Sequence, residues 1–162
     1  MLKKFAPALV ISLLWTSSVF AVSPPVLFEA MDGGSITMTS QSTAHLNGTG
    51  IATPGGAVND SASLSLVESK KCTGGFSVHL IGVYTVNDAT DALGSEIHYI
   101  VDQDLCPTAQ KGIFVGNGVF SITGGTGKFW NASGGGKFDG LGDFITLKYT
   151  CTLQGLAFLN NP

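Results

Sequence analysis

The feature that most constrains this sequence is the alternation of apolar and polar residues over short segments that end at Gly, Asn, Asp or Pro. A period of two places successive side chains on opposite faces of a β-strand. Apolar residues do not accumulate into stripes with the spacing of a helix. The pattern therefore predicts an antiparallel sheet with one face in a core. The clearest example is 143–153, whose apolar face holds Ile145, Leu147, Tyr149, Cys151 and Leu153.

The sequence predicts a single all-β domain of eight strands. Residues that tolerate positive φ mark the turns between them. A closed antiparallel barrel fits eight strands because closure removes exposed strand edges. A two-sheet β-sandwich is the alternative. The predicted strands lie near 34–40, 44–52, 62–69, 75–84, 95–103, 112–123, 127–139 and 143–153. The predicted turns are Gly55-Gly56 after Pro54, Asn87-Asp88, Gly124-Gly125, and Gly140 with Gly142.

The first 21 residues resemble a signal peptide, with Lys3 and Lys4 before an apolar stretch and small residues up to Ala21. We expect cleavage after Ala21 and export to a periplasm or out of the cell. The apolar stretch is shorter than the ~20 residues that a membrane anchor needs, and no later stretch is long and apolar enough to cross a membrane as a helix. We expect a signal peptide at 1–21, an N-terminal segment at 22–33 and the barrel domain at 34–158.

Charge and motif content exclude several function classes. The formal net charge is −3 and the chain contains no Arg, which argues against nucleic-acid binding. His45, His79 and His98 do not have metal-ligand spacing, so we expect no metal. The glycines at 123–127 precede a strand-like segment and not a helix, so we expect no nucleotide cofactor.

A Gly-x-Gly-x-Phe unit occurs twice in the C-terminal third, at 116–120 and at 134–138. Glycines at alternate positions bare one face of a strand, so the strand can curve sharply or lie beneath an aromatic ring from its neighbour. We assign structural roles to the glycines and aromatic residues of this region. They are Gly116, Gly118, Phe120, Gly124, Gly125, Gly127, Phe129, Gly134, Gly136 and Phe138.

The segment 112–153, and above all Gly124-Gly125-Thr126-Gly127-Lys128-Phe129 followed by the second Gly-x-Gly-x-Phe unit, resembles the C-terminal part of the allene oxide cyclase and dirigent superfamily. The resemblance implies an eight-stranded barrel, often trimeric, with an apolar cavity that in relatives holds oxylipins or phenolic radicals. It carries no catalytic residue across, because the matched positions are structural.

The three cysteines of an exported protein predict one disulfide and one free thiol. A hairpin of 75–84 and 95–103 centred on Ala89 places Cys72 opposite Cys106, which favours that disulfide. Pairing of Cys151 with either of them is the alternative. We expect Cys151 to be a buried and inert thiol on the last strand.

The best polar constellation is one face of the predicted strand 95–103, where Glu96, His98 and Asp102 point the same way. The hairpin register above places His98 opposite Leu80. If this face lines a cavity, Glu96 and His98 are a candidate acid and base, and Asp102 a ligand-binding residue. If it faces solvent, they are surface residues, which is the reading we favour because ionisable side chains are seldom buried unless paired.

With no catalytic residue evident, the sequence favours a non-enzymatic barrel that binds a small apolar ligand or a partner. The alternative is a cyclase-like or dirigent-like protein that steers an apolar substrate in its cavity. A second alternative is a component of an extracellular surface or matrix, for which an exposed aromatic patch near Trp130 would be typical.

Overall fold

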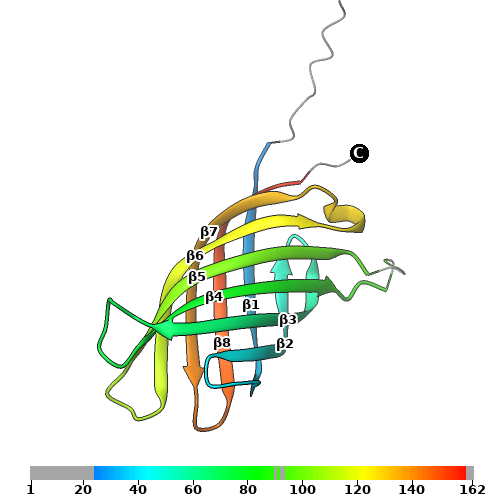
Figure 1. The fold of residues 1–162 in the computed structure, drawn as a ribbon. Coiled ribbons are helices and arrows are strands. Elements are labelled where there is room, and N and C mark those ends of the chain that lie inside the picture. The colour runs from blue at the N-terminus through cyan, green and yellow to red at the C-terminus, as the bar shows by residue number, and fades with distance from the viewer. Residues whose placement is uncertain (1–23, 90, 92–93, 160–162) are drawn as a thin grey trace, which may run out of the picture.

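The structure is a computed structural model that describes residues 24–89, 91 and 94–159. These residues form one closed antiparallel barrel, in which strands pair in sequence order and β1 pairs with β8 (Figure 1). The short 3-10 helix η1 (Gly127–Phe129) joins β6 to β7. The strands are β1 (Val26–Met38), β2 (Thr43–Thr53), β3 (Gly56–Glu68), β4 (Phe76–Val86), β5 (Glu96–Pro107), β6 (Ile113–Gly125), β7 (Ser133–Asp143) and β8 (Lys148–Phe158).

The predicted all-β barrel is confirmed, and the sandwich alternative is wrong because β1 and β8 close the sheet. The first strand begins at Val26, so most of the segment expected to precede the barrel is part of β1. The expected signal peptide, 1–21, lies outside the described residues. Within the ranges described, no helix has the length and hydropathy needed to cross a membrane.

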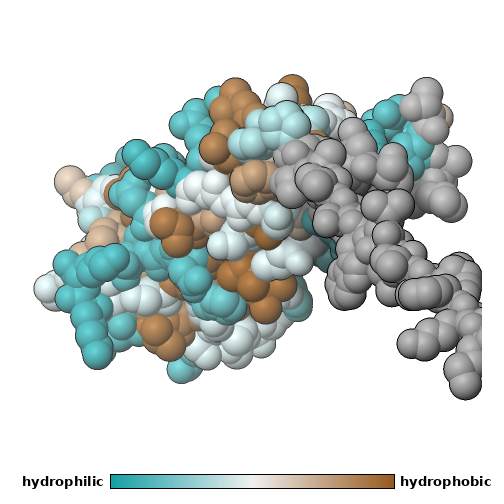
Figure 2. Space-filling view, turned by 90° about the horizontal axis from the view of Figure 1, so that it is seen from above, coloured by the Kyte–Doolittle hydropathy of each residue, from teal (hydrophilic) through white to brown (hydrophobic). Residues whose placement is uncertain are grey.

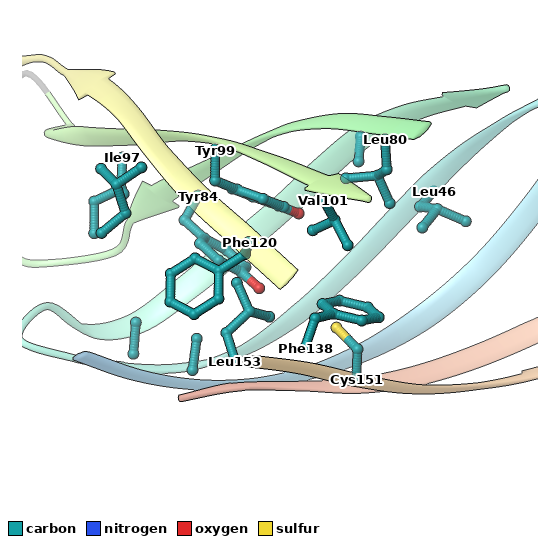
Figure 3. Close-up of a cluster of buried hydrophobic side chains, with 14 of the residues drawn as sticks. Leu46, Leu80, Tyr84, Ile97, Tyr99, Val101, Phe120, Phe138, Cys151 and Leu153 are labelled. Carbon is teal, nitrogen blue, oxygen red and sulfur yellow. The ribbon is translucent and has the colours of Figure 1, made fainter. Parts of the chain in front are cut away.

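One end of the barrel is filled by apolar side chains. Along each strand, alternate residues point inward, as the period of two predicts. Ile97, Phe120 and Leu153 are among the side chains that lie together in the interior (Figure 3). Phe28 packs against Phe120 with ring centroids 5.5 Å apart. This end therefore forms a closed core.

The two Gly-x-Gly-x-Phe units pair with each other across β6 and β7. Gly118 lies opposite Phe138, and Phe120 lies opposite Gly136. Each buried phenylalanine is thus beside a position without a side chain, and both rings fit inside the barrel. The structural role assigned to the ten residues of this region stays a prediction, which the pairing of these two units supports.

The predicted boundaries near the C-terminus were wrong. The segment 127–132 holds η1 and turn residues, so β7 begins at Ser133. Gly140 and Gly142 lie inside β7 and not in a turn, because the rings of Phe138 and Phe144 occupy the space beside them. The turn is at 144–147, where Leu147 adopts a φ of 55°. Ile145 and Leu147, expected in the core, are exposed for that reason.

The disulfide between Cys72 and Cys106 is confirmed, although the register that suggested it is wrong by three residues. His98 lies opposite Val83 and not opposite Leu80. Cys72 is outside β4, in a turn where the Gly75 amide donates to the Cys72 carbonyl. The turn places Cys72 beside the C-terminal end of β5, where Cys106 lies. The two cysteines therefore form a disulfide without being paired residues of neighbouring strands.

Candidate functional site

A layer of polar side chains crosses the interior of the barrel between the packed core and the open half. Its two carboxyl groups are Asp32 on β1 and Asp60 on β3, and both are buried. The strand between them, β2, presents Gly48 and Gly50 inward, so both carboxyl groups extend over bare backbone. The other members of the layer are Tyr84, Tyr99, Tyr149 and Cys151.

Asp60 accepts hydrogen bonds from two tyrosine hydroxyls. Tyr99 donates to Oδ1 at 2.6 Å and Tyr149 donates to Oδ2 at 2.7 Å. Burial, together with the nearby charge of Asp32, raises the pKa of Asp60 from 3.8 to about 6, although the two tyrosine hydrogen bonds act in the opposite direction. Asp60 is therefore a carboxyl group that gains and loses its proton close to neutral pH.

The hydrogen bonds that described residues donate to Asp32 all reach one of its two oxygens. The Tyr84 hydroxyl donates to its Oδ2 at 2.5 Å, and the Cys151 thiol donates to the same oxygen at 3.1 Å. Its Oδ1 is buried and has no partner among the described residues. Burial and the Asp32 charge raise the pKa of the Cys151 thiol, which fits the inert, buried thiol expected from the sequence.

The tyrosine rings are positioned by glycines. A Cβ at Gly82 would lie 2.3 Å from the Tyr99 ring, and one at Gly48 would lie 2.4 Å from the Tyr149 hydroxyl oxygen. Tyr99 also stacks on Tyr84, with ring centroids 4.7 Å apart. In Figure 3 the hydroxyl groups of Tyr84 and Tyr99 extend from their strands into the interior. The glycines therefore give the phenol groups access to the carboxyl groups.

A cavity of about 50 Å³ lies beside this layer, toward the barrel end that carries the loops 39–42, 69–75, 108–112 and 144–147. Its walls are mostly apolar and include Leu46, Leu80 and Phe138. Its polar lining residues include Asp60, Tyr99, Gln103 and Tyr149, and Gln103 Oε1 is buried without a partner among the described residues. The cavity thus joins an apolar wall to a polar inner end.

Aromatic residues surround the outer end of this half of the barrel. Phe114 packs against Phe76 at 5.7 Å and against Phe144 at 5.2 Å between ring centroids. Phe144 also lines the cavity. A ligand that projects from the cavity toward Phe144 would therefore meet phenyl rings.

The residues chosen from the sequence lie elsewhere. Glu96, His98 and Asp102 point away from the barrel interior, since their neighbours Ile97, Tyr99 and Val101 are the buried residues of β5. His98 Nε2 is 2.9 Å from Glu96 Oε2, and Asp102 pairs with His79 on β4 at 2.7 Å. These are solvent-facing pairs on the outer surface, and none of the three residues is brought into the cavity.

Sequence reasoning missed the interior carboxyl groups. Asp32 fell in the segment expected to precede the barrel, and Asp60 lay just before a strand predicted to begin at residue 62. The alternation of the sequence could have revealed Asp60. It lies at every second position with Val58 and Ala62, so it shares their apolar strand face. An acid on an otherwise apolar face is a candidate buried functional group.

The described residues contain no group of His, Cys, Asp and Glu arranged to hold a metal ion. Comparisons with protein-family models, curated proteins and solved structures gave no match to this chain. The allene oxide cyclase or dirigent resemblance therefore stays a prediction, while the eight-stranded antiparallel barrel stands on the structure itself.

Proposed function

We propose that the protein is an exported binding protein whose barrel cavity takes one end of a small, mostly apolar molecule. The observation that carries the proposal is the cavity, whose mostly apolar lining also includes a few polar residues, among them Asp60, Gln103 and Tyr149. Ligand pockets in proteins generally combine apolar walls with a small number of polar groups that orient the ligand. The disulfide supports export, since disulfides are typical of oxidising compartments.

The size of the cavity limits what it can hold. A cavity of about 150 Å³ accommodates benzene, so a volume of about 50 Å³ takes only two or three heavy atoms. A larger ligand would therefore insert its head and leave its tail against Phe144 and the neighbouring rings. The same consideration makes a fully enclosed oxylipin a poor fit.

The proposal is tested by titrating the ¹⁵N-labelled protein with 1-butanol and benzyl alcohol and following its amide resonances. We expect the largest shifts at Leu46, Leu80 and Gln103, which line the cavity. Ala44→Leu adds three carbon atoms at a lining position and should abolish these shifts. Asn47→Leu, on the outer face of the same strand, is the matched control and should leave them unchanged.

Two outcomes contradict the proposal. In one, the shifts map to the outer face of the barrel. In the other, Ala44→Leu and Asn47→Leu respond to the two alcohols alike. Native mass spectrometry of the purified protein, which reports a retained ligand and the number of subunits together, also tests the trimer that the superfamily resemblance implies.

The second candidate function is acid catalysis on a bound apolar substrate, and the protonation behaviour of Asp60 favours it. A carboxyl group with a pKa of about 6 still holds its proton in a fraction of molecules at neutral pH and can deliver it to a substrate. Under this function, Asp60 is the proton donor, and Tyr99 and Tyr149 hold its carboxyl group in place.

Styrene oxide is a suitable probe for this second function, because an acid can protonate its ring oxygen as a carbon–oxygen bond breaks. A water molecule then adds to the carbon and releases a proton, which restores the acid. We expect ring opening above the buffer rate, lost in Asp60→Asn and kept in Asp102→Asn, with the products measured by chromatography. Equal rates with and without the protein would eliminate acid catalysis on this probe and leave the binding function as the proposal.

Surface or matrix roles have less support. Trp130 is exposed, as that role would need. On the face shown in Figure 2, however, apolar residues lie in separate groups among hydrophilic ones. This face lacks the broad apolar patch that a surface for assembly usually presents.

A further inference from the structure

The interior of the barrel carries two acidic groups, and no basic side chain of the described residues lies beside them. Asp32 and Asp60 are both buried; tyrosine hydroxyls and a thiol, which are neutral, donate hydrogen bonds to them, and the two carboxyl groups also interact with each other. The ion pairs among the described residues involve other carboxyl groups, all with partners on the outer surface. A buried charge is stable only when it is paired or neutralised, so this layer is poised to accept a positive group.

The basic side chains of the barrel do not supply that group. Every lysine in the described part of the chain is exposed, and the three histidines point outward from their strands. The described lysines are Lys70, Lys71, Lys111, Lys128, Lys137 and Lys148. In the described part of the chain, therefore, these two carboxyl groups can be balanced by a proton or by a cation from outside, but not by a basic side chain.

The cavity gives an external cation access to one of the two acids. Asp60 is part of its wall, and each carboxylate oxygen can accept more than the single bond it receives from a tyrosine. The side chain of Gln103 also lines the cavity; its Oε1 lies beside Gly116, where a Cβ would be 2.0 Å away, and is a buried acceptor with no partner among the described residues. An ammonium group has three donors and no acceptor, which complements a set of acceptors better than a hydroxyl, a carbonyl or a carboxylate does.

We propose that the ligand of this cavity is a small apolar amine whose ammonium group binds at Asp60 and Gln103. The inference rests on the proposed binding function and specifies its ligand class. The first carbons of the amine lie along Leu46, Leu80 and Phe138, and the remainder extends toward Phe144. Carboxylic acids are excluded, because their anion would meet the interior carboxyl groups.

The pairing requires Asp60 to be ionised, which gives it a characteristic pH dependence. The groups that face Asp60 are Tyr149 and Cys151 from β8, Tyr99 from β5, Tyr84 from β4 and Asp32 from β1. Burial raises the pKa values of the three tyrosines and of Cys151, so these four stay neutral near pH 7. Amine affinity should therefore fall as the pH drops below about 6, where Asp60 takes up a proton.

The test compares three probes of similar size, n-butylamine, 1-butanol and butyrate, by calorimetric and NMR titration of the purified protein at pH 7.5. We expect n-butylamine to bind at least about tenfold more tightly than 1-butanol, since a charge-assisted hydrogen bond is roughly twice as strong as a neutral one. Butyrate should not bind. Asp60→Asn should remove the tenfold preference, Gln103→Leu should reduce it, and Asp102→Asn is the surface control that should keep it.

The outcomes separate this inference from the function on which it rests. If 1-butanol binds in the cavity as tightly as n-butylamine, or if butyrate binds, the binding function stands and the amine inference is overturned. If none of the three probes binds, both fail. Because the comparison of probes uses the unmodified protein, it remains decisive even if Asp60→Asn does not fold, and an affinity for n-butylamine that is flat between pH 5 and 7.5 would also contradict the inference.

Discussion

Tyr99 reaches Asp60 only because Gly82, opposite it on β4, has no side chain. The ring lies where a Cβ at residue 82 would be, and its hydroxyl donates to Asp60. Tyr99 cannot easily move aside, since it is buried and stacks on Tyr84. The arrangement of the polar layer therefore depends on a residue that contributes no atom to it.

Gly82→Ala should lower the free energy of unfolding by about 1–3 kcal/mol, the usual cost of overpacking a well-packed interior. The added methyl group would also displace the Tyr99 hydroxyl from Asp60. Chemical denaturation measures the first effect, and the amide shift of Asp60 reports the second. In a Tyr99→Leu background the same substitution should cost much less, and an equal cost in both backgrounds would show that the ring is not the obstacle.

At the scale of elements, periodicity predicted the strands well and their ends poorly. The alternation in 143–153 correctly placed Tyr149, Cys151 and Leu153 inside the barrel. It did not reveal that the apolar residues at 145 and 147 belong to a turn, because a period of two continues through a short turn without any change in composition. Glycines were an equally ambiguous sign of a turn. Gly140 and Gly142 lie within a strand, where the absence of a side chain makes room for aromatic rings.

The error in the register of β4 and β5 shows why the site was harder to predict than the fold. Opposed residues of an antiparallel pair point to the same side, so a shift by an odd number of residues reverses the face of every side chain. With the predicted register, His98 shares a side with the buried Leu80; with the observed one, it shares a side with Val83. The disulfide prediction was nevertheless right. Cys72 lies in the turn at 72–75 and not in β4, so its position beside Cys106 does not depend on the register of β4 and β5.

For the molecule as a whole, Asp60 and Asp104 make the free energy of unfolding depend on pH in opposite directions. Asp104, whose side chain lies on the outer face of β5, accepts hydrogen bonds from Lys71, Ser77 and Ser69. These bonds lower its pKa to about 2. Its contribution is present above the ordinary value of 3.8 and is lost as the pH falls toward 2. Asp60 acts oppositely, because its pKa is raised in the folded protein.

Between pH 3.8 and about 6 the folded protein holds a proton on Asp60 that the unfolded chain has released, so the free energy of unfolding should fall as the pH rises through this range. A pKa rise of this size corresponds to roughly 3 kcal/mol. Denaturant unfolding from pH 3 to 8 should therefore show greatest stability near pH 4, set by Asp60 on the alkaline side and by Asp104 on the acid side. Asp60→Asn should remove the decline between pH 4 and 6, whereas Asp102→Asn should leave it. A stability that rises from pH 4 to 6 in the unmodified protein would mean that Asp60 is ionised at lower pH, and that an interior cation or water already balances its charge.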